Sequence, residues 1–326
     1  MRHVRITTTG SAVPSWRLDN EELVRRFGLT VDPAWIEAQT GIRERHWLEP
    51  GETTSDLCLR AAQTILERRG IEARDLDRVV LATVSPDVPS PSTATIVARK
   101  LGARCPAFDL SAACAGFLYG LDLGAGSVRA GEEKVLVLAA DARSRFIDTK
   151  DHRGTVLFAD AAAGALLEPS EEPGLVSIAL GAEGRERQGA YVPAGGAQQP
   201  TTRETVAAGL HYIHVDGKRE IFDLFVGYVL EAVGMALERA QLTLDDVDLF
   251  ITHQGNANLT SEIGAALGLN AVKVVDCVAR HGNTSGASVP LALDESFSER
   301  RIGPGSTVLL ASVGAGYTFG AAVHRF

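Results

Sequence analysis

The stretch ILERRGIEARDLDRVVLAT at Ile65–Thr83 decides the fold, because it occurs twice in the chain. Its counterpart is ALERAQLTLDDVDLFITHQ at Ala236–Gln254, and the matching residues Leu66 and Leu237 are 171 positions apart. In each copy, apolar residues at helical spacing predict the end of a helix, and a short apolar run predicts the strand that follows it. We therefore expect two α/β units built on the same plan.

The match continues in order beyond this block. ATIVARKLG, which ends at Gly102, matches SEIGAALG, which ends at Gly268, and CPAFDLSAACAG then matches KVVDCVARHGNTSG. A two-copy repeat of about 170 residues indicates a duplicated domain and not a solenoid. Two unrelated α/β units with a common pattern are the alternative, which the three ordered blocks disfavour. We place the halves at residues 1–172 and 173–326.

Strands and helices alternate along the rest of the chain. Short apolar runs rich in branched residues predict strands, and stretches with apolar residues at three- and four-residue spacing predict helices. This alternation is typical of an α/β fold in which helices cover the sheets. The predicted strands are Asp77–Val84, Lys134–Ala140, Val247–Thr252 and Thr307–Ser312, and the predicted helices include Asp56–Arg69 and Phe225–Arg239.

Composition excludes several classes of function. The chain has 326 residues, 45% of them apolar, which suffices for a buried core without disulfides. Its net charge of −9 disfavours a nucleic-acid partner, which needs a basic face. There is no apolar run near the roughly 18 residues of a membrane span, and no signal-like start, so we expect a cytoplasmic protein without a membrane partner. The four cysteines show no CxxC or zinc spacing, so we expect reduced thiols and no metal.

Cys114 is the candidate nucleophile. It lies in DLSAACAGFLYG, where a strand is expected to end near Leu110 and a helix to begin at Ala115 or Gly116. A helix N-terminus favours the thiolate and supplies N–H donors, so we expect a lowered pKa and an oxyanion site. The alternative is an inert buried cysteine, which is how we interpret the other three: Cys58, Cys105 and Cys277.

His253 and Asn283 are candidate partners of this thiol. His253 ends the strand VDLFIT and precedes a loop, which is where ligands gather in α/β proteins. Asn283 lies in RHGNTSGAS, seven residues after Asp276, and Cys114 lies five residues after the matching Asp109. A pseudo-twofold axis would bring these two turns together. Taken singly, a polar cap explains the histidine and turn chemistry explains the asparagine.

The order Cys, His, Asn is found in two chemistries. Papain-like hydrolases have a similar Cys-to-His spacing, but they need a CGSCW-type turn and are usually disulfide-bonded. Enzymes that condense thioesters have the same order, and they agree better with AACAG in a duplicated α/β chain.

Six further motifs make the chain resemble the β-ketoacyl-[acyl-carrier-protein] synthase III family almost from end to end. That resemblance implies the thiolase fold, with two repeated halves in five αβαβα layers. The motifs are AWIEAQTGIRERH at Ala34–His46, CPAFDLSAACAGF, DHRGTVLFADAAAGA, THQGN in place of HQAN, ARHGNTSGASVPLAL and SVGAGYTFGAAVHRF.

The resemblance also implies roles for the site residues. Cys114 accepts the acyl group, and His253 and Asn283 bind the thioester carbonyl of a malonyl extender, where two neutral donors stabilise the enolate left by decarboxylation. The backbone N–H groups of Cys114 and Ala315 form a second oxyanion hole. We expect a homodimer with acyl thioester and acyl carrier protein as partners, and no cofactor apart from coenzyme A thioester as substrate.

The binding residues depart from the family pattern. Trp35, Arg153 and Asn256 keep their identities and are expected to contact substrate. Ser90 stands where short-chain members have Phe, on a loop expected to cross into the partner's site, which predicts a pocket for medium or long acyl chains. Basic residues expected at the entrance are replaced, and only Lys218 and Arg219 lie near enough in sequence to compensate; the replacements are Gln39, Asp223, Asn258, Ala265 and Ala266.

Other members of the same superfamily remain as alternatives. The lost basic residues weaken docking of an acidic carrier protein, so a ketosynthase of specialised metabolism, which joins two acyl chains or transfers an acyl group, is the runner-up. A degradative thiolase needs a second cysteine in its C-terminal glycine loop, which GAGYTFG lacks. A nucleotide-dependent dehydrogenase needs GxGxxG after its first strand, where only Gly10 is found.

Overall fold

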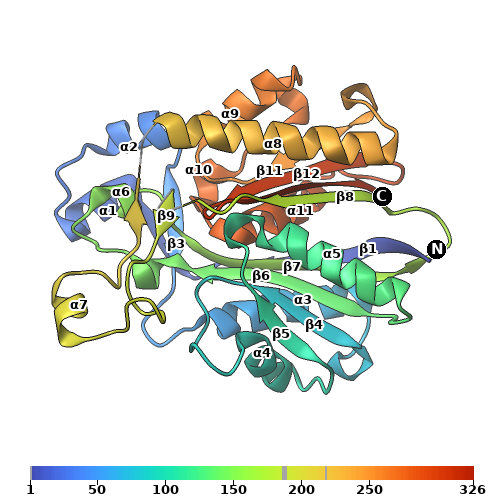
Figure 1. Cartoon of the computed structure of the whole chain (residues 1–326), viewed down its shortest axis with the longest axis horizontal. Helices are drawn as coiled ribbons and strands as arrows, with labels where there is room; N and C mark the ends of the chain where they lie inside the picture. Colours follow the sequence, from blue (N-terminus) through green and yellow to red (C-terminus); the bar gives the residue numbers. More distant parts are fainter. Residues whose placement is uncertain (1, 186–188, 217–218) are drawn as a thin grey trace.

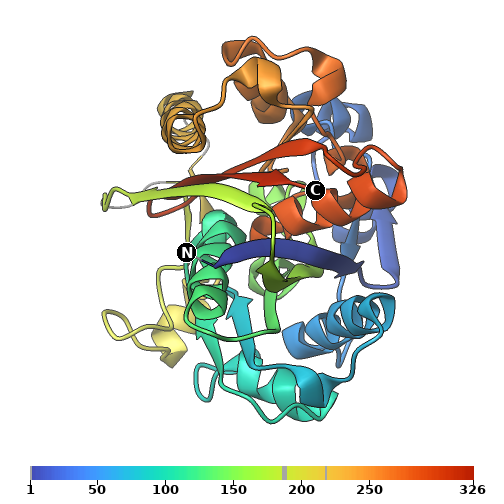
Figure 2. The ribbon, with the colours of Figure 1, turned by 90° about the vertical axis from the view of Figure 1, so that its right-hand side faces the viewer.

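The computed structural model describes residues 2–185, 189–216 and 219–326 and consists of five alternating layers of helix and sheet (Figure 1, Figure 2). Two sheets enclose a central pair of helices, and further helices cover the outer face of each sheet. This arrangement confirms the expected five-layer thiolase fold with two repeated halves.

The first sheet is built from the N-terminal half, with strand order β1-β7-β6-β4-β5. β1 and β7 run antiparallel to their neighbours, whereas β6, β4 and β5 are mutually parallel. The β6 strand is buried along its whole length, as expected for a strand covered on both faces. The bounds are β1 His3–Ala12, β4 Arg78–Ala82, β5 Ala107–Leu110, β6 Val135–Ala142 and β7 Asp160–Ser170.

The second sheet repeats this plan with strand order β8-β13-β12-β11. An isolated parallel bridge between Phe250 and Val274 takes the place of a fifth strand, at the position that β5 has in the first sheet. The predicted boundary at 172/173 falls in the connection between β7 and β8. The bounds are β8 Leu175–Ala182, β11 Leu249–Thr252, β12 Thr307–Gly314 and β13 Thr318–Arg325.

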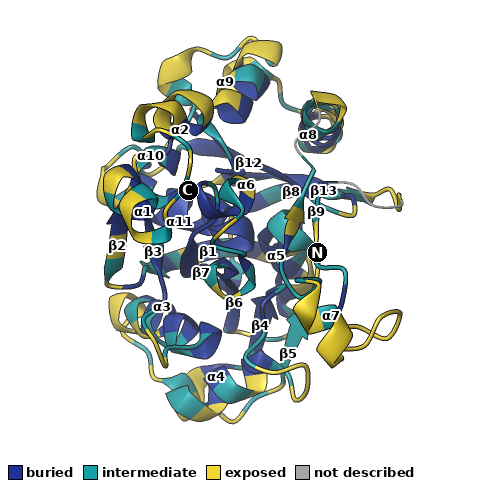
Figure 3. Cartoon of the chain, turned by 90° about the vertical axis from the view of Figure 1, so that its left-hand side faces the viewer, coloured by how far each residue is buried: buried dark blue, intermediate teal, exposed yellow. Residues whose placement is uncertain are grey.

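The central helices α5 and α11 bury their side chains against both sheets in one shared cluster. On α5, Gly116, Gly120 and Gly124 form one face, and a Cβ at any of them would come within 2.8 Å of a side chain of the sheet. This close approach brings the start of α5 to the ends of the strands. The outer helices expose one face, as Figure 3 shows. The bounds are α3 Thr54–Arg69, α4 Thr93–Leu101, α5 Gly116–Arg129, α8 Arg219–Ala240, α9 Ala257–Ala266 and α11 Ser288–Ser298.

Smaller elements close one end of the layers, where α1, α2, β2 and β3 pack on one another. All six sequence-predicted elements are present, and most of their ends shift by two residues or fewer, but the helix predicted to begin at Phe225 begins at Arg219. Among the described residues, no helix is both long and apolar enough to cross a membrane. The remaining bounds are β2 Trp16–Asp19, α1 Asn20–Phe27, α2 Pro33–Thr40, β3 Glu44–Trp47, α6 His152–Thr155, β9 Ala190–Tyr191, α7 Arg203–Ala207, β10 His214–Val215 and α10 Val278–His281.

Candidate active site

Cys114 lies in a single 3₁₀ turn, Ala113–Ala115, that joins β5 to α5. The second half of the chain fixes this turn: the Ser312 hydroxyl donates to the Cys114 carbonyl at 2.7 Å, and Thr318 donates to the Ala112 carbonyl at 2.7 Å. Gly314 packs so closely that a Cβ there would lie 2.7 Å from the Cys114 nitrogen. The absence of a side chain at Gly314 therefore lets β12 end directly beside the thiol.

The pKa of Cys114 runs against the expectation from the helix N-terminus. Desolvation of this half-buried side chain raises the pKa of the thiol to about 11, because the thiolate is solvated less well there than in bulk water. The Ser285 hydroxyl, 3.7 Å from Sγ, and the charge of Arg143 act in the opposite direction without offsetting burial. The expected lowered pKa is therefore wrong. Cys58 and Cys277 are buried as expected, and Cys105 is half-buried at the edge of the core.

His253 is buried and neutral. Burial lowers the pKa of its imidazole to about 4. Nδ1 lies 2.7 Å from the Ser288 hydroxyl, which also accepts the backbone N–H of Gln254 at 3.3 Å. When the Ser288 hydroxyl donates its proton to Nδ1, the ring proton lies on Nε2, and this is the tautomer in which Nε2 is a donor.

Asn283 is oriented just as firmly. Its Oδ1 accepts the backbone N–H of Ser285 at 2.9 Å, which fixes the amide and leaves Nδ2 as a donor. A Cβ placed on Gly255 would lie 2.8 Å from His253 Nε2 and 3.4 Å from Asn283 Nδ2. Both donors therefore border the same small space.

Cys114 and Ala315 line two cavities at once. One, of about 420 Å³, is also lined by His253, Asn283 and Asn256. The other, of about 440 Å³, extends from the thiol past Ser285 and Arg143. The thiol and the backbone predicted for the second oxyanion hole thus lie where the two cavities meet.

Sequence reasoning missed three polar residues that support this site: Ser285, Ser288 and Asp141. Asp141 is 1% exposed and accepts hydrogen bonds from the backbone N–H of Val84 at 2.9 Å and of Gly286 at 3.1 Å. It thereby ties the turn after Asn283 to the first sheet. The available signal was the run of hydroxyl residues in GNTSGAS, directly after Asn283.

Comparison with known proteins identifies the family. The model of the family described as 3-oxoacyl-[acyl-carrier-protein (ACP)] synthase III matches residues 108–184. The model of the C-terminal part of the same family matches residues 237–326. The β-ketoacyl-[acyl-carrier-protein] synthase III of Symbiobacterium thermophilum is 42% identical over 329 residues, with 100% of this chain and 99% of the relative covered. The chain belongs to the β-ketoacyl-[acyl-carrier-protein] synthase III family. It is an acyltransferase-class condensing enzyme, of a family that uses acyl-coenzyme A and acyl carrier protein substrates.

Solved structures agree with this synthase III assignment. The synthase III of Thermus thermophilus is 34% identical, with a TM-score of 0.90 and 99% of both chains covered. The priming β-ketosynthase of the R1128 polyketide pathway is 31% identical, with a TM-score of 0.92, and the match covers 100% of this chain and 96% of that one. The similar structures thus include a synthase III and a priming ketosynthase of a polyketide pathway.

The other residues predicted to bind substrate differ in whether they line the two cavities. Asn256 lines the first cavity, but its Oδ1 caps α9 through the Asn258 N–H at 2.8 Å. Trp35 is 42% exposed and packs edge-on against His152 with ring centroids 5.9 Å apart. Arg153 pairs with Asp151 at 2.7 Å. Trp35 and Arg153 line neither cavity.

Ser90 is exposed on the loop before α4 and lines neither cavity within one chain. Its expected role depends on a partner subunit, so it stays a prediction.

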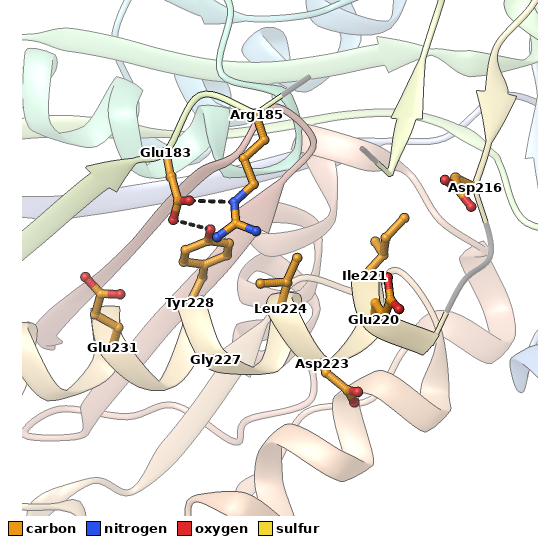
Figure 4. Close-up of a pocket in the computed structure, with 10 residues that line it drawn as sticks. All are labelled: Glu183, Arg185, Asp216, Glu220, Ile221, Asp223, Leu224, Gly227, Tyr228 and Glu231. Atoms are coloured by element: carbon orange, nitrogen blue, oxygen red, sulfur yellow. Dashed lines mark hydrogen bonds and ion pairs between the residues drawn. The ribbon is translucent and has the colours of Figure 1, made fainter. Parts of the chain in front are cut away.

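Near the first cavity, the basic side chain of Arg219 is paired, and the adjoining side chains are mostly acidic. Arg219 pairs with Asp223 at 2.8 Å and with Glu262 at 2.7 Å, so its charge does not compensate for the missing basic residues. Lys218 lies outside the described residues. Beside the entrance, a cavity of about 790 Å³ is lined by Arg185 and by acidic side chains (Figure 4), namely Glu183, Asp216, Glu220, Asp223 and Glu231. At the replaced positions, the Gln39 carbonyl accepts from Asn258 at 2.9 Å, and Ala265 and Ala266 are exposed on α9.

Proposed function

We propose that Cys114 accepts an acyl group from a thioester and that His253 and Asn283 then drive the decarboxylation of a malonyl thioester. The observation that supports this assignment is the pair of neutral donors, Nε2 and Nδ2, that border one space in a cavity shared with a thiol. A papain-like hydrolase needs its histidine as a proton acceptor near neutral pH, which a pKa of about 4 disfavours.

In the first half-reaction, Sγ of Cys114 attacks the carbonyl carbon of the acyl thioester. A C–S bond to Cys114 forms, the C–S bond to coenzyme A breaks, and the released thiol takes the proton that Cys114 loses. The backbone N–H groups of Cys114 and Ala315 donate to the oxyanion of the tetrahedral intermediate. Because the thiol's pKa is about 11, a small fraction is thiolate at neutral pH, so deprotonation contributes to the barrier.

In the second half-reaction, the malonyl thioester enters the cavity that holds both donors. Its carboxylate leaves as carbon dioxide, and the negative charge passes to the thioester oxygen, where His253 and Asn283 donate. The resulting carbon nucleophile attacks the acyl carbonyl on Cys114. A C–C bond forms, the bond to Sγ breaks, and the thiolate regains a proton. The reaction requires no cofactor beyond the thioester substrates.

The finer identity of the substrates belongs to the same proposal. A starter with a medium, long or unusual acyl chain is supported by Ser90, and a homodimer would complete the pocket there. A cytoplasmic acyl carrier protein brings the extender. Electrostatic attraction contributes less to its docking than it would at a surface rich in basic residues, because Arg219 is already paired.

A ketosynthase of specialised metabolism is the second candidate. It is favoured by the acidic surroundings of the entrance and by the similarity to a priming β-ketosynthase. Both candidates share the acylation of Cys114, and they differ in the starter, the carrier and the acceptor of the acyl group.

The test separates the two half-reactions. His253→Ala and Asn283→Ala should still form an acyl-Cys114 adduct by peptide mass analysis, yet release carbon dioxide from malonyl thioester on the order of 10²–10³ more slowly. Cys114→Ala should lose the adduct. An adduct on Cys58, Cys105 or Cys277 with Cys114 free, or normal decarboxylation in both donor variants, would refute the assignment.

A further inference from the structure

Arg143 is a buried cation in the wall of the second cavity. The residue is 7% exposed and lines the cavity of about 440 Å³ together with Cys114. Within the described part of the chain, no carboxylate or hydrogen-bond acceptor pairs with its guanidinium, and its Nε is buried without a partner. The contact that the structure does give it is the ring of Phe158, whose centroid lies 5.2 Å from Cζ.

Among the described residues, Arg143 therefore has no counter-ion, whereas buried charges in proteins are normally paired. The neighbouring charges are already committed. Arg185, which lines the same cavity, pairs with Glu183 (Figure 4), and Glu183 also accepts from Tyr228. Asp141 accepts from two backbone N–H groups and from the Ser85 hydroxyl. A ligand with a negative charge would therefore provide a counter-ion for Arg143.

The position of Arg143 shows which substrate would bear that charge. His253 and Asn283 line the first cavity, whereas Arg143 lines only the second. A cation on the malonyl carboxylate would also stabilise the charge that decarboxylation must release. The anion facing Arg143 thus belongs to the acyl chain on Cys114.

We propose that Arg143 binds a carboxylate at the far end of the acyl chain, so that the starter is an ω-carboxyacyl thioester. A guanidinium matches a carboxylate through two parallel hydrogen bonds and is the preferred partner for this group. Apolar residues of the same cavity, among them Val84, Ala190 and Val192, would enclose the methylenes between the two ends. This inference rests on the proposed role of Cys114 as acyl acceptor.

The experiment compares loading of matched thioesters. Glutaryl- and adipyl-coenzyme A are each paired with the neutral isostere in which an isopropyl group replaces the carboxylate, 5-methylhexanoyl and 6-methylheptanoyl. The wild type should load at least one carboxylated member of a pair faster than its isostere. Arg143→Met should lower that preference roughly 10- to 100-fold. The loss of its charge beside the thiol slows both members of a pair equally, so the ratio of the two loading rates is the quantity that tests the inference. Misfolding cannot change that ratio selectively, and Arg143→Lys should keep part of the preference.

Arg145→Met is the matched control, because Arg145 is exposed two residues away and donates to backbone carbonyls of Glu49 and Glu52. It should leave the preference unchanged. A wild type that prefers the neutral member of both pairs would overturn the inference while leaving the proposed function intact. Equal slowing of all thioesters in Arg143→Met would also overturn it, since Arg143 would then act on the thiol alone. No adduct on Cys114 with any thioester would refute the proposed function itself.

Discussion

The Sγ of Cys114 lies 3.7 Å from the Oγ of Ser285, across the junction of the two repeated halves. Each residue belongs to a 3₁₀ turn that leads into a central helix, Ala113–Ala115 before α5 and Ser285–Ala287 before α11. Both turns begin with a residue of positive φ, 45° at Ala113 and 53° at Ser285. The site is thus formed by two equivalent turns, of which one carries Cys114 and the other carries Ser285 beside its thiol.

This contact predicts the effect of removing the Ser285 hydroxyl. Ser285→Ala should raise the pKa of Cys114 further, because burial would act without the hydrogen bond that opposes it. Alkylation of Cys114 by iodoacetamide should slow about fivefold at pH 8, which corresponds to about 1 kcal/mol. The rate as a function of pH, with Ser111→Ala as control on the same cavity wall, checks this. An unchanged or lowered titration midpoint would contradict it.

Ser288 should act as a positioning residue for His253. Ser288→Ala removes the partner of Nδ1, so the ring loses its preferred tautomer and Nε2 is protonated less of the time. We expect malonyl decarboxylation to fall about tenfold while loading of Cys114 stays unchanged. Nitrogen chemical shifts of His253 should report the tautomer change, and Ser288→Thr should restore part of the activity. Equal losses in loading and decarboxylation would indicate a general structural effect instead.

The pH dependence should separate the two half-reactions. Because burial lowers the pKa of His253 to about 4, the imidazole is neutral above about pH 5, and decarboxylation should stay flat from pH 9 down to pH 5. Below about pH 5 the imidazole becomes protonated. A positive charge is unfavourable in this buried site, so the rate of decarboxylation should fall. Loading should instead rise with pH through the neutral range, because the pKa of Cys114 is about 11. A decarboxylation midpoint near 6.5 would contradict the assignment.

Ser90 should set the length of the acyl pocket across the dimer. Each methylene buried in an apolar pocket contributes roughly 0.8 kcal/mol, or about fourfold in affinity. Ser90→Phe should therefore lower the ratio of decanoyl to acetyl loading, on the order of a hundredfold if about four methylenes are displaced. Ser90 is exposed within one chain, so the substitution leaves the subunit core intact. An unchanged ratio would show that other residues close the pocket.

The sequence predicts much of this fold because its strands are continuous apolar runs and its repeat is long. Val135–Ala142 and Thr307–Gly314 are buried throughout, so their sequences show no competing pattern. The order of Cys114, His253 and Asn283 could likewise be found from motifs. What could not be predicted depends on tertiary burial. The direction of the Cys114 pKa is one case, because a helix start is visible in sequence and the exclusion of water is not.

The supporting residues were missed for a related reason. Ser285, Ser288 and Asp141 are common residue types whose partners are distant in sequence: Cys114 and Ser285 are 171 positions apart, and Asp141 and Gly286 are 145 apart. Arg143 is a similar case, since only the structure shows that this arginine is buried and has no counter-ion among the described residues.

The turn that holds Cys114 is anchored by Ser312 and Thr318, which belong to the other half of the chain. The two halves are therefore interdependent. The first carries Cys114, and the second carries His253 and Asn283 together with the hydroxyl groups that hold the Cys114 turn. We therefore expect a chain cut between β7 and β8 to be active only when both fragments reassociate. Neither fragment should be an active enzyme on its own.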